Sequence, residues 1–503
     1  MPSSFKRTTT DNIPIPTDIV GSSTFGRDNK IQSSRTYNLL ISDDWLVDTY
    51  GYAVVKKVSP DLSGRGIFSS VRGEFILAVV GNKVLRLTPT IISGSPLSNI
   101  SAQEVGQIDT FTGDVFIAEN NANQIAICDK SELYIYNYIT ASFESATLPD
   151  GVIPGYVTYQ TGYFIIVDLL SSSWYLSDVN NGLSWFWGVS GTPVSGDIQT
   201  KPDKGAAAVR ISGKGNLLFV MGTTVTEQWT SVPSPIFPYQ RSTSSNIDYG
   251  CINPATISSS DELTAWLGGN EKSGPVILFS DGNTVSQIST DGYNFLFSNL
   301  KNPTKSSAFF MKISGHLIYQ ITFYDPDDNV SLIYDFTTKK FFDVTDENMD
   351  YHPLREVAYF KDRYYSISFN DGNIYQITEN IPVYDYADRG SFEIPRIRIC
   401  SNIRSPNQLR FSATNFSFIL EQGNDPEHIV PDPSYQPRIA LSISKDGGYE
   451  FSSYVSKPVS RLARRQRRLV WWNLGSMNDL VLQLRFFSRG QFRAADGLVN
   501  LWQ

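Results

Sequence analysis

A run of arginines near the C-terminus is the part of the chain with the clearest binding chemistry. Five arginines fall within eight residues: Arg461, Arg464, Arg465, Arg467 and Arg468. A guanidinium group presents a planar fork of N–H donors that matches the oxygens of a phosphate or a carboxylate. Contacts to phosphates release counterions, so the attraction ignores base sequence and weakens with salt. The run predicts binding to DNA or to an acidic protein surface, with a solvated loop as the third reading.

A tight turn of specific chemistry precedes this run. Ser444, Asp446, Gly448 and Phe451 match the pattern called an Asp-box. In such a turn the aspartate accepts hydrogen bonds from its own backbone, the glycine takes a strained torsion, and the aromatic ring pins the hairpin to the core. We interpret these four residues as a folding device.

The Asp-box also raises an enzymatic alternative, because the pattern is common in sialidases. Their chemistry needs clustered arginines, a tyrosine nucleophile with an acidic partner, and an acid/base aspartate. No Arg-Ile-Pro motif lies near the N-terminus, and Ile394–Arg396 has the wrong order and position. We predict no catalytic residue, and a sialidase-like glycan-cleaving propeller enzyme remains the alternative.

Cysteines and histidines give no sign of a metal or cofactor site. None of them forms a CxxC, HxH or HExxH pattern, which metal and redox sites commonly use. The residues concerned are scattered: Cys128, Cys251, Cys400, His316, His352 and His428. We predict buried free thiols, with no metal and no cofactor.

The composition indicates an all-β protein with two oppositely charged parts. Hydrophobic residues make up 41% of the 503 residues and aromatic residues 13%, which is enough for a packed core. Richness in Ser, Thr, Asn, Gly, Tyr and Phe favours strands and turns over helices. From Tyr386 onward, 16 Lys and Arg stand against 10 Asp and Glu, whereas residues 1–385 carry 26 against 40. The chain is thus +6 in one part and −14 in the other, which predicts two surfaces for different partners.

Short apolar runs recur along the middle of the chain. Each opens at a glycine or acidic residue, and the seven openings lie 40 to 53 residues apart: Gly73, Gly113, Gly162, Gly215, Glu262, Gly315 and Asp362. Asp-Gly turns at Asp281 and Asp371 supply the positive φ angles that two-residue hairpin turns demand. Units of this length, made of several antiparallel strands, are typical of propeller blades. We predict a six- or seven-bladed β-propeller, with tandem β-sandwiches as the competing arrangement.

The segments around these repeats have a different character. Residues 1–55, with Ile13-Pro14-Ile15-Pro16, indicate an extended N-terminal arm and the first strands, and residues 56–385 form the propeller. Residues 386–503 are predicted to form a C-terminal β-domain that carries the arginine-rich loop. Trp471 and Trp472 alternate across one of its strands, so we expect one in the core and the other at an interface or under an arginine. No secretion signal opens the chain, and no apolar stretch is long enough to span a membrane.

Several blocks, in their order, resemble the packaged-DNA stabilisation or tail hub (nozzle) proteins of short-tailed bacteriophages, the podovirus tail accessory factors. The late block is the Leu441–Gly448 hairpin, followed by Arg468 to Gly475 and an apolar strand. The middle block runs from Pro202 to the Glu227-Gln228-Trp229 sequence, and the segment 236–251 follows it. Asn473 and Ser476–Asp479 depart from the basic residues of the family, which restricts any expected DNA contact to the arginine run.

The resemblance implies a structural virion protein of the viral tail. Such proteins form a ring, usually a hexamer, below the portal and adaptor proteins of the head-to-tail connector. The ring retains packaged double-stranded DNA, forms part of the DNA ejection channel, and anchors tail fibres, spikes or a plug. The implied location is the virion tail, with assembly in the host bacterial cytoplasm. A propeller-type protein-interaction scaffold is the third alternative.

Overall fold

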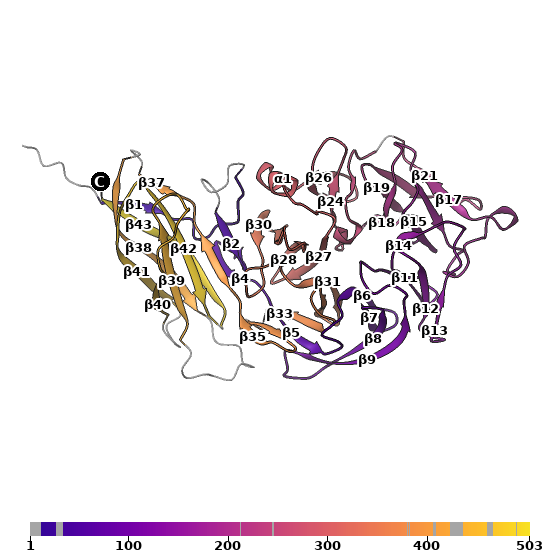
Figure 1. Ribbon diagram of the computed structural model, residues 1–503, viewed down its shortest axis with the longest axis horizontal. Coiled ribbons are helices and arrows are strands. Elements are labelled where there is room, and N and C mark those ends of the chain that lie inside the picture. Colours follow the sequence, from indigo (N-terminus) through magenta and orange to yellow (C-terminus); the bar gives the residue numbers. More distant parts are fainter. Residues whose placement is uncertain are drawn as a thin grey trace, which may run out of the picture.

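Antiparallel strands make up almost all of the molecule (Figure 1). The computed structural model describes residues 12–26, 34–211, 213–243, 246–379, 381, 383–405, 409–422, 436–459, 466–488 and 490–502. These residues contain 43 strands, one α-helix, α1 (Asp291–Ser298), and two 3-10 turns, η1 (Val189–Gly191) and η2 (Pro254–Thr256). The predicted all-β class is confirmed. Among these residues, no helix has the length and apolar character to cross a membrane.

Residues 51–378 form seven consecutive antiparallel meanders. The first is β6 (Gly64–Ser70), β7 (Phe75–Val80), β8 (Lys83–Ile91) and β9 (Ser98–Gln107), and the second is β10 (Phe116–Glu119), β11 (Gln124–Cys128), β12 (Leu133–Asn137) and β13 (Ser142–Ser145). The third is β14 (Pro154–Gln160), β15 (Tyr163–Asp168), β16 (Ser173–Leu176) and β17 (Val194–Asp197), and the fourth is β18 (Gly205–Arg210), β19 (Leu217–Gly222), β20 (Thr226–Ser231) and β21 (Tyr239–Arg241).

The remaining meanders follow the same plan. The fifth is β22 (Gly250–Cys251), β24 (Thr264–Gly269), β25 (Val276–Ser280) and β26 (Val285–Gln287), with β23 (Ser258–Ser259) also on β24. The sixth is β27 (Ser306–Ile313), β28 (His316–Phe323), β29 (Val330–Asp335) and β30 (Lys340–Asp343). The seventh is β31 (Leu354–Phe360), β32 (Arg363–Ser368), β33 (Ile374–Thr378) and β5 (Gly51–Lys56), so its outer strand comes from the N-terminal part of the chain.

The meanders follow one another around a ring, as a propeller requires (Figure 1). The first strands of most successive meanders contact each other, β23 and η2 of the fifth contact β27 of the sixth, and β31 of the last contacts β6 of the first. The second strands are apolar on both faces because each lies between two neighbouring sheets. All six residues of β7, Phe75–Val80, are buried, for example.

Some details of the predicted repeat are wrong. The run at Gly113 falls on β10, the first strand of its meander, whereas the other six runs fall on second strands. Gly282 has the predicted positive φ, at 83°, but Gly372 lacks one, and the turns at Asp281 and Asp371 are longer than two residues. Their aspartates instead accept hydrogen bonds from Asn283 N and Asn373 N, at 2.9 and 3.0 Å. A side-chain carboxylate closes these turns.

The C-terminal strands form a β-sandwich to which the N-terminal strands contribute. One sheet, called sheet A here, contains β3 (Leu39–Ser42), β4 (Trp45–Asp48), β43 (Phe492–Trp502), β38 (Phe411–Gln422) and β41 (Gln466–Met477), with β1 (Asn12–Pro16) also on β43. The opposing strands are β2 (Arg35–Tyr37), β36 (Arg396–Ile399), β42 (Asp479–Phe487), β39 (Arg438–Ser444) and β40 (Val455–Pro458), with β37 (Ile403–Arg404) also on β42. The predicted domain boundaries at residues 55 and 385 stay predictions. The N-terminal strands β1, β3 and β4 share one sandwich with the C-terminal strands.

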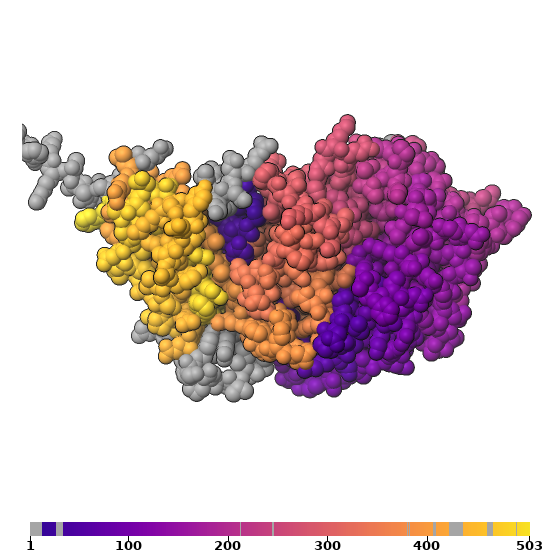
Figure 2. Space-filling view, viewed as in Figure 1, coloured from indigo at the N-terminus to yellow at the C-terminus, as the bar shows by residue number. Residues whose placement is uncertain are grey.

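The sandwich and the propeller are joined by continuous sheets. Strand β2 pairs with β30 of the sixth meander on one side and β36 on the other, which makes a ten-stranded sheet. Strand β5 likewise pairs with β34 (Val383–Tyr386), which pairs with β35 (Gly390–Glu393). One hydrophobic core cluster contains both Phe342 of β30 and Phe416 of β38. Figure 2 shows the indigo N-terminal residues between the yellow strands of the sandwich and the propeller.

Ion pairs with at least one buried side chain lie at this junction. The Arg398 side chain is fully buried and donates to Asp18 Oδ2 at 2.9 Å. Arg396 lies 3.3 Å from Asp48, and Arg35 pairs with Asp343 of β30 at 2.5 Å. The alternation of arginine with isoleucine in residues 396–399 therefore does not make a solvent-facing basic surface.

An aromatic cluster surrounds His352 close to the junction. The rings of Tyr50, Tyr52 and Tyr384 lie edge-on, with centroids 5.5 to 5.8 Å from the imidazole. Gln320 Nε2 lies 3.2 Å from His352 Nδ1, while the other ring nitrogen, His352 Nε2, has no hydrogen-bond partner. Because Tyr50 donates to the Gln320 carbonyl oxygen, the amide nitrogen faces His352 and Nδ1 accepts. Burial lowers the pKa of His352 to about 3.

This shift predicts a loss of stability in acid. The unfolded chain binds a proton on His352 below pH 6.5, but the folded protein does so only near pH 3, so the stability is present above 6.5 and declines as pH falls. The full loss is on the order of 5 kcal/mol. Denaturant titrations of wild type and His352→Gln between pH 7 and 4 should show the smaller decline in the variant. Equal declines would contradict a neutral buried imidazole.

Candidate interaction face

The described part of the predicted arginine run lies at the start of β41. Arg461, Arg464 and Arg465 lie outside the described residues. Arg467 Nη1 donates to the Pro458 carbonyl at 3.0 Å, and Arg468 Nη2 donates to Ser417 Oγ at 3.1 Å. Among the described residues, neither arginine forms an ion pair with a carboxylate.

The two tryptophans that follow point to opposite sides of sheet A. Trp471 is buried, stacks 5.9 Å from Phe418 with an interplanar angle of 2°, and donates from Nε1 to the Val455 carbonyl at 3.0 Å. Trp472 is 66% exposed. The prediction that one ring fills the core is confirmed, and the other is free to meet a partner.

Strand register places more apolar side chains on the outer side of sheet A, beside Trp472. One row across the sheet is Pro14, Asn500, Asn415 and Trp472, and the next is Pro16, Leu498, Ser417 and Val470. Trp502 lies opposite Ser412, and Ile419 lies opposite Arg468. We call this set the outer face of sheet A. Leu498 is 45% exposed and Trp502 51%.

Sequence reasoning missed most of this face. Pro14 is separated from Arg468 by hundreds of residues, and Leu498 and Trp502 lie on another strand. No local sequence pattern links them. The one available signal was the proline alternation in Ile13–Pro16, because proline lacks an N–H and is tolerated at the edge of a sheet.

The Asp-box residues form the connection between β39 and β40. Asp446 Oδ1 accepts hydrogen bonds from Ser444 Oγ at 2.6 Å and from the Tyr449 and Glu450 N–H groups. These bonds, that of Ser444 first, lower the pKa of Asp446. Gly448 has a φ of 97°, and Phe451 is half-buried. The turn is stabilised internally, and we still interpret it as structural.

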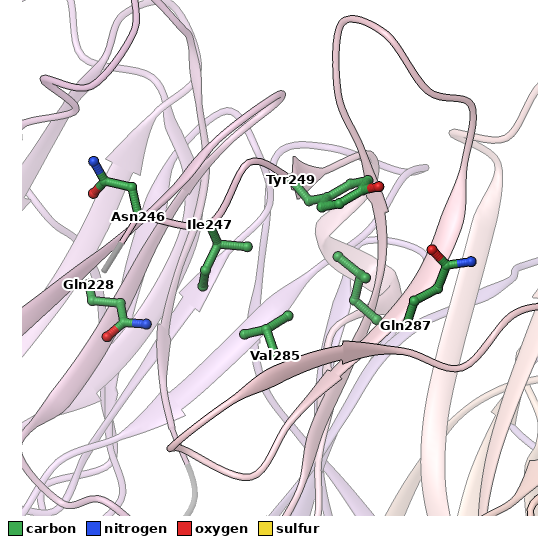
Figure 3. Close-up of a pocket in the computed structure, with 7 residues that line it drawn as sticks. Gln228, Asn246, Ile247, Tyr249, Val285 and Gln287 are labelled. Carbon is green, nitrogen blue, oxygen red and sulfur yellow. The ribbon is translucent and has the colours of Figure 1, made fainter. Parts of the chain in front are cut away.

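A cavity of about 320 Å³ lies between the fourth and fifth meanders. Figure 3 shows side-chain amides at both ends, with Gln228 and Asn246 on one side and Gln287 on the other. Ile247 and Val285 lie between them. None of the lining residues is a carboxylate or a cation, so this cavity lacks the acidic pair that most glycoside hydrolysis requires.

The motif residues of the resemblance have structural contacts. Glu227 is buried, and its Oε1 accepts hydrogen bonds from the Gln199 and Thr200 N–H groups at 2.8 and 2.7 Å. The same oxygen pairs with Arg241 at 3.0 Å, and Trp229 Nε1 donates to Oε2 at 3.2 Å. This carboxylate therefore ties the third meander to the fourth.

The cysteines are free and buried, as predicted. Burial raises the pKa of each thiol, at Cys128, Cys251 and Cys400, to about 12, which keeps the thiols protonated and unreactive. Over the described part of the chain, no group of His, Cys, Asp and Glu has the arrangement of a metal site.

Comparison with protein families gives one match. A family model described as the bacteriophage P22 Gp10 β-propeller matches residues 40–308, which is more than half of the 503 residues. No curated protein matches the sequence.

Solved structures give weaker likenesses. The N-terminal domain of Nup159 covers 68% of this chain and 98% of its own, with 11% identity and a TM-score of 0.40. A chain of the mitotic checkpoint complex covers 66% and 94%, with 12% identity and a TM-score of 0.39. U3-55K covers 65% and 98%, with 10% identity and a TM-score of 0.39. Scores at this level carry no argument about function.

Proposed function

We propose, because this chain belongs to the family of the bacteriophage P22 Gp10 β-propeller, that it forms the tail hub ring of a short-tailed phage. The family is one of structural phage proteins that stabilise packaged DNA, and this chain is accordingly a structural component of the virion. The finer proposal is a ring, usually of six copies, below the portal and adaptor proteins. In that position it retains the packaged DNA, forms part of the ejection channel, and anchors fibres or spikes. The family match carries the proposal.

The charge distribution supports a role between two kinds of surface. The part of the chain from Tyr386 onward carries an excess of six positive charges, and Arg467 and Arg468 have no carboxylate partner among the described residues. A channel through which DNA must slide should not hold it tightly, yet five arginines in each of several copies would do so. We therefore propose that the arginine run mainly contacts an acidic patch on an adjoining tail subunit, with DNA contact second.

Replacing Arg464, Arg465, Arg467 and Arg468 by Ala tests this assignment in phage particles. We expect the tail ring to dock poorly, because each lost cation removes an attraction to the neighbouring subunit. The measurement is tail composition by mass spectrometry together with retained DNA. The control replaces four exposed propeller lysines: Lys272, Lys312, Lys339 and Lys340.

Two results would contradict the assignment. Rings that dock normally while DNA leaks would make DNA the main contact of the arginines. Particles assembled without this protein that keep their DNA as well as wild type would contradict the tail hub function itself. A fluorogenic glycoside assay on the purified protein tests the enzymatic alternative, for which we expect no turnover.

A further inference from the structure

We propose that the outer face of sheet A binds a second copy of this chain, through the acidic surface of that copy's second and third propeller meanders. This inference rests on the proposed ring and deepens it by naming the two surfaces that meet. It also explains why the part of the chain from Tyr386 onward and the part before it carry opposite net charge.

The first argument is the apolar character of the outer face. Trp472, Trp502, Leu498 and Ile419 are 66%, 51%, 45% and 37% exposed. The rows that hold them span β1, β43, β38 and β41, roughly 15 Å at the usual strand spacing. Contiguous exposed apolar patches of this kind mark interaction sites, and tryptophan is among the residues that dominate interface energies.

The middle of the face is already ordered for contact. Asn500 Nδ2 donates to Asn415 Oδ1 at 2.9 Å, so the two amides between Pro14 and Trp472 are hydrogen-bonded to each other. Arg468 is held against Ser417 at 3.1 Å at the side of the same face. Apolar side chains with hydrogen-bonded polar groups among them and an arginine beside them have the composition of a protein–protein interface.

The same composition argues against DNA as the occupant. A DNA backbone would pair with Arg468, but its phosphates would leave Leu498 and Ile419 without apolar cover. A folded protein surface with carboxylates and exposed aliphatic side chains satisfies both kinds of group.

The chain itself contains such a surface. Residues 131–200 include no Lys, Arg or His, although they include six acidic residues: Glu132, Glu144, Asp150, Asp168, Asp178 and Asp197. Asp168 is buried, whereas Glu144, Asp150 and Asp197 are exposed. Carboxylates without neighbouring basic residues in the sequence are thus supplied by one uninterrupted segment, residues 131–200.

Exposed aliphatic side chains accompany these carboxylates. Ile139, Val179 and Val189 are 71%, 53% and 74% exposed, and Leu170 is 58% exposed. They lie on connections of the second and third meanders. Strands β13 and β17 of these meanders lie at the end of the molecule opposite sheet A (Figure 1). One molecule cannot bring these surfaces together, but two copies can.

The resulting contact joins two different surfaces, head to tail. A heterologous contact of this kind closes into a ring when its rotation permits and otherwise extends into a filament. It leaves every copy in a closed ring with one occupied outer face and one occupied acidic surface.

Two variants of the full chain test the inference by mass photometry. Trp472→Ser with Trp502→Ser removes the outer face, and Glu144→Lys with Asp150→Lys and Asp197→Lys reverses the acidic surface. We expect each to raise the concentration needed for assembly at least about tenfold, because interface tryptophans and opposed charges dominate such contacts. Phe111→Ser with Ile236→Ser, at two exposed propeller positions, is the control and should assemble as wild type. Circular dichroism verifies that each variant is folded.

Mixing the two defective variants gives the sharpest result. Each retains the surface that the other has lost, so the mixture should form heterodimers and nothing larger. Wild type that stays monomeric, alone and with the adaptor protein, would contradict the proposed ring. Wild type that assembles while the tryptophan variant assembles equally well would overturn this inference and leave the ring standing.

Other outcomes also overturn it. If the tryptophan variant forms rings but no longer joins the adaptor, the face binds another virion protein. If wild type shifts a short DNA duplex at physiological salt and the tryptophan variant does not, the face binds DNA. If only the acid-reversed variant assembles normally, the propeller surface is not the occupant.

Discussion

Replacing Asp343 by Ala is expected to lower the free energy of unfolding by about 3 kcal/mol, because it leaves the largely buried charge of Arg35 without a partner. The Asp343 side chain is 4% exposed and its Oδ2 accepts from Arg35 Nε at 2.8 Å and from Ser23 Oγ at 2.5 Å. Arg35 also stacks on Phe25, 4.1 Å from the ring centroid, so it cannot move to solvent without losing that contact.

The effect should concentrate at the junction. Asp343 belongs to β30 of the propeller, and Arg35 belongs to β2 of the sandwich, so this pair joins the two parts. Hydrogen exchange should therefore show faster exchange in β2 and β36 than in β7.

The matched control is Asp388→Ala. Asp388 pairs with Lys57 at 3.4 Å, but the two side chains are 59% and 64% exposed, and such surface pairs contribute at most about 1 kcal/mol. Denaturant unfolding of wild type and both variants measures the difference. A loss at Asp343 no larger than that at Asp388 would show that the buried pair does not hold the junction.

Local patterns in the sequence were enough to find the propeller. Six of the seven predicted runs are second strands, because a strand covered on both faces must be apolar throughout. The run at Gly113 was misplaced because β11, Gln124–Cys128, opens at a glutamine and carries no glycine signal. The positive φ predicted for the Asp-Gly turns is present at Gly282 but not at Gly372, where the turn forms with the Asp371 carboxylate accepting from Asn373 N.

Long-range pairing was beyond the sequence. Nothing in Gly51–Lys56 indicates that it pairs with β33 and β34, more than 300 residues away. The pairing of β1 with β43 is equally invisible, and with it the contribution of Pro14 and Pro16 to the outer face of sheet A. The arginine run and the Trp471–Trp472 alternation were accessible because they are local. The apolar face around them depends on the register of four strands.

The closing strand of the propeller gives the second large expected effect. Replacing Gly51 by Ala should lower the free energy of unfolding by about 3 kcal/mol, because β5 lies between two neighbours with no room for a side chain. A Cβ at residue 51 would lie 1.9 Å from the Ile381 carbonyl oxygen and 2.6 Å from that of Val383. Both are backbone atoms, so no side-chain rotation relieves the clash.

The closed propeller makes this local clash strongly destabilising. Strand β5 supplies the outer strand of the seventh meander and simultaneously pairs with β34, which leads into the sandwich. Displacing β5 opens the propeller and exposes the edge of β33. Amide hydrogen exchange should therefore rise in β31–β33 before it rises in β18–β21. Gly215→Ala is the control, since no atom lies within 4 Å of its added Cβ, and it should change stability by less than about 1 kcal/mol. If Gly51→Ala unfolds at the same denaturant concentration as Gly215→Ala, then β5 does not close the propeller, and strands β31–β33 hold the seventh meander together alone.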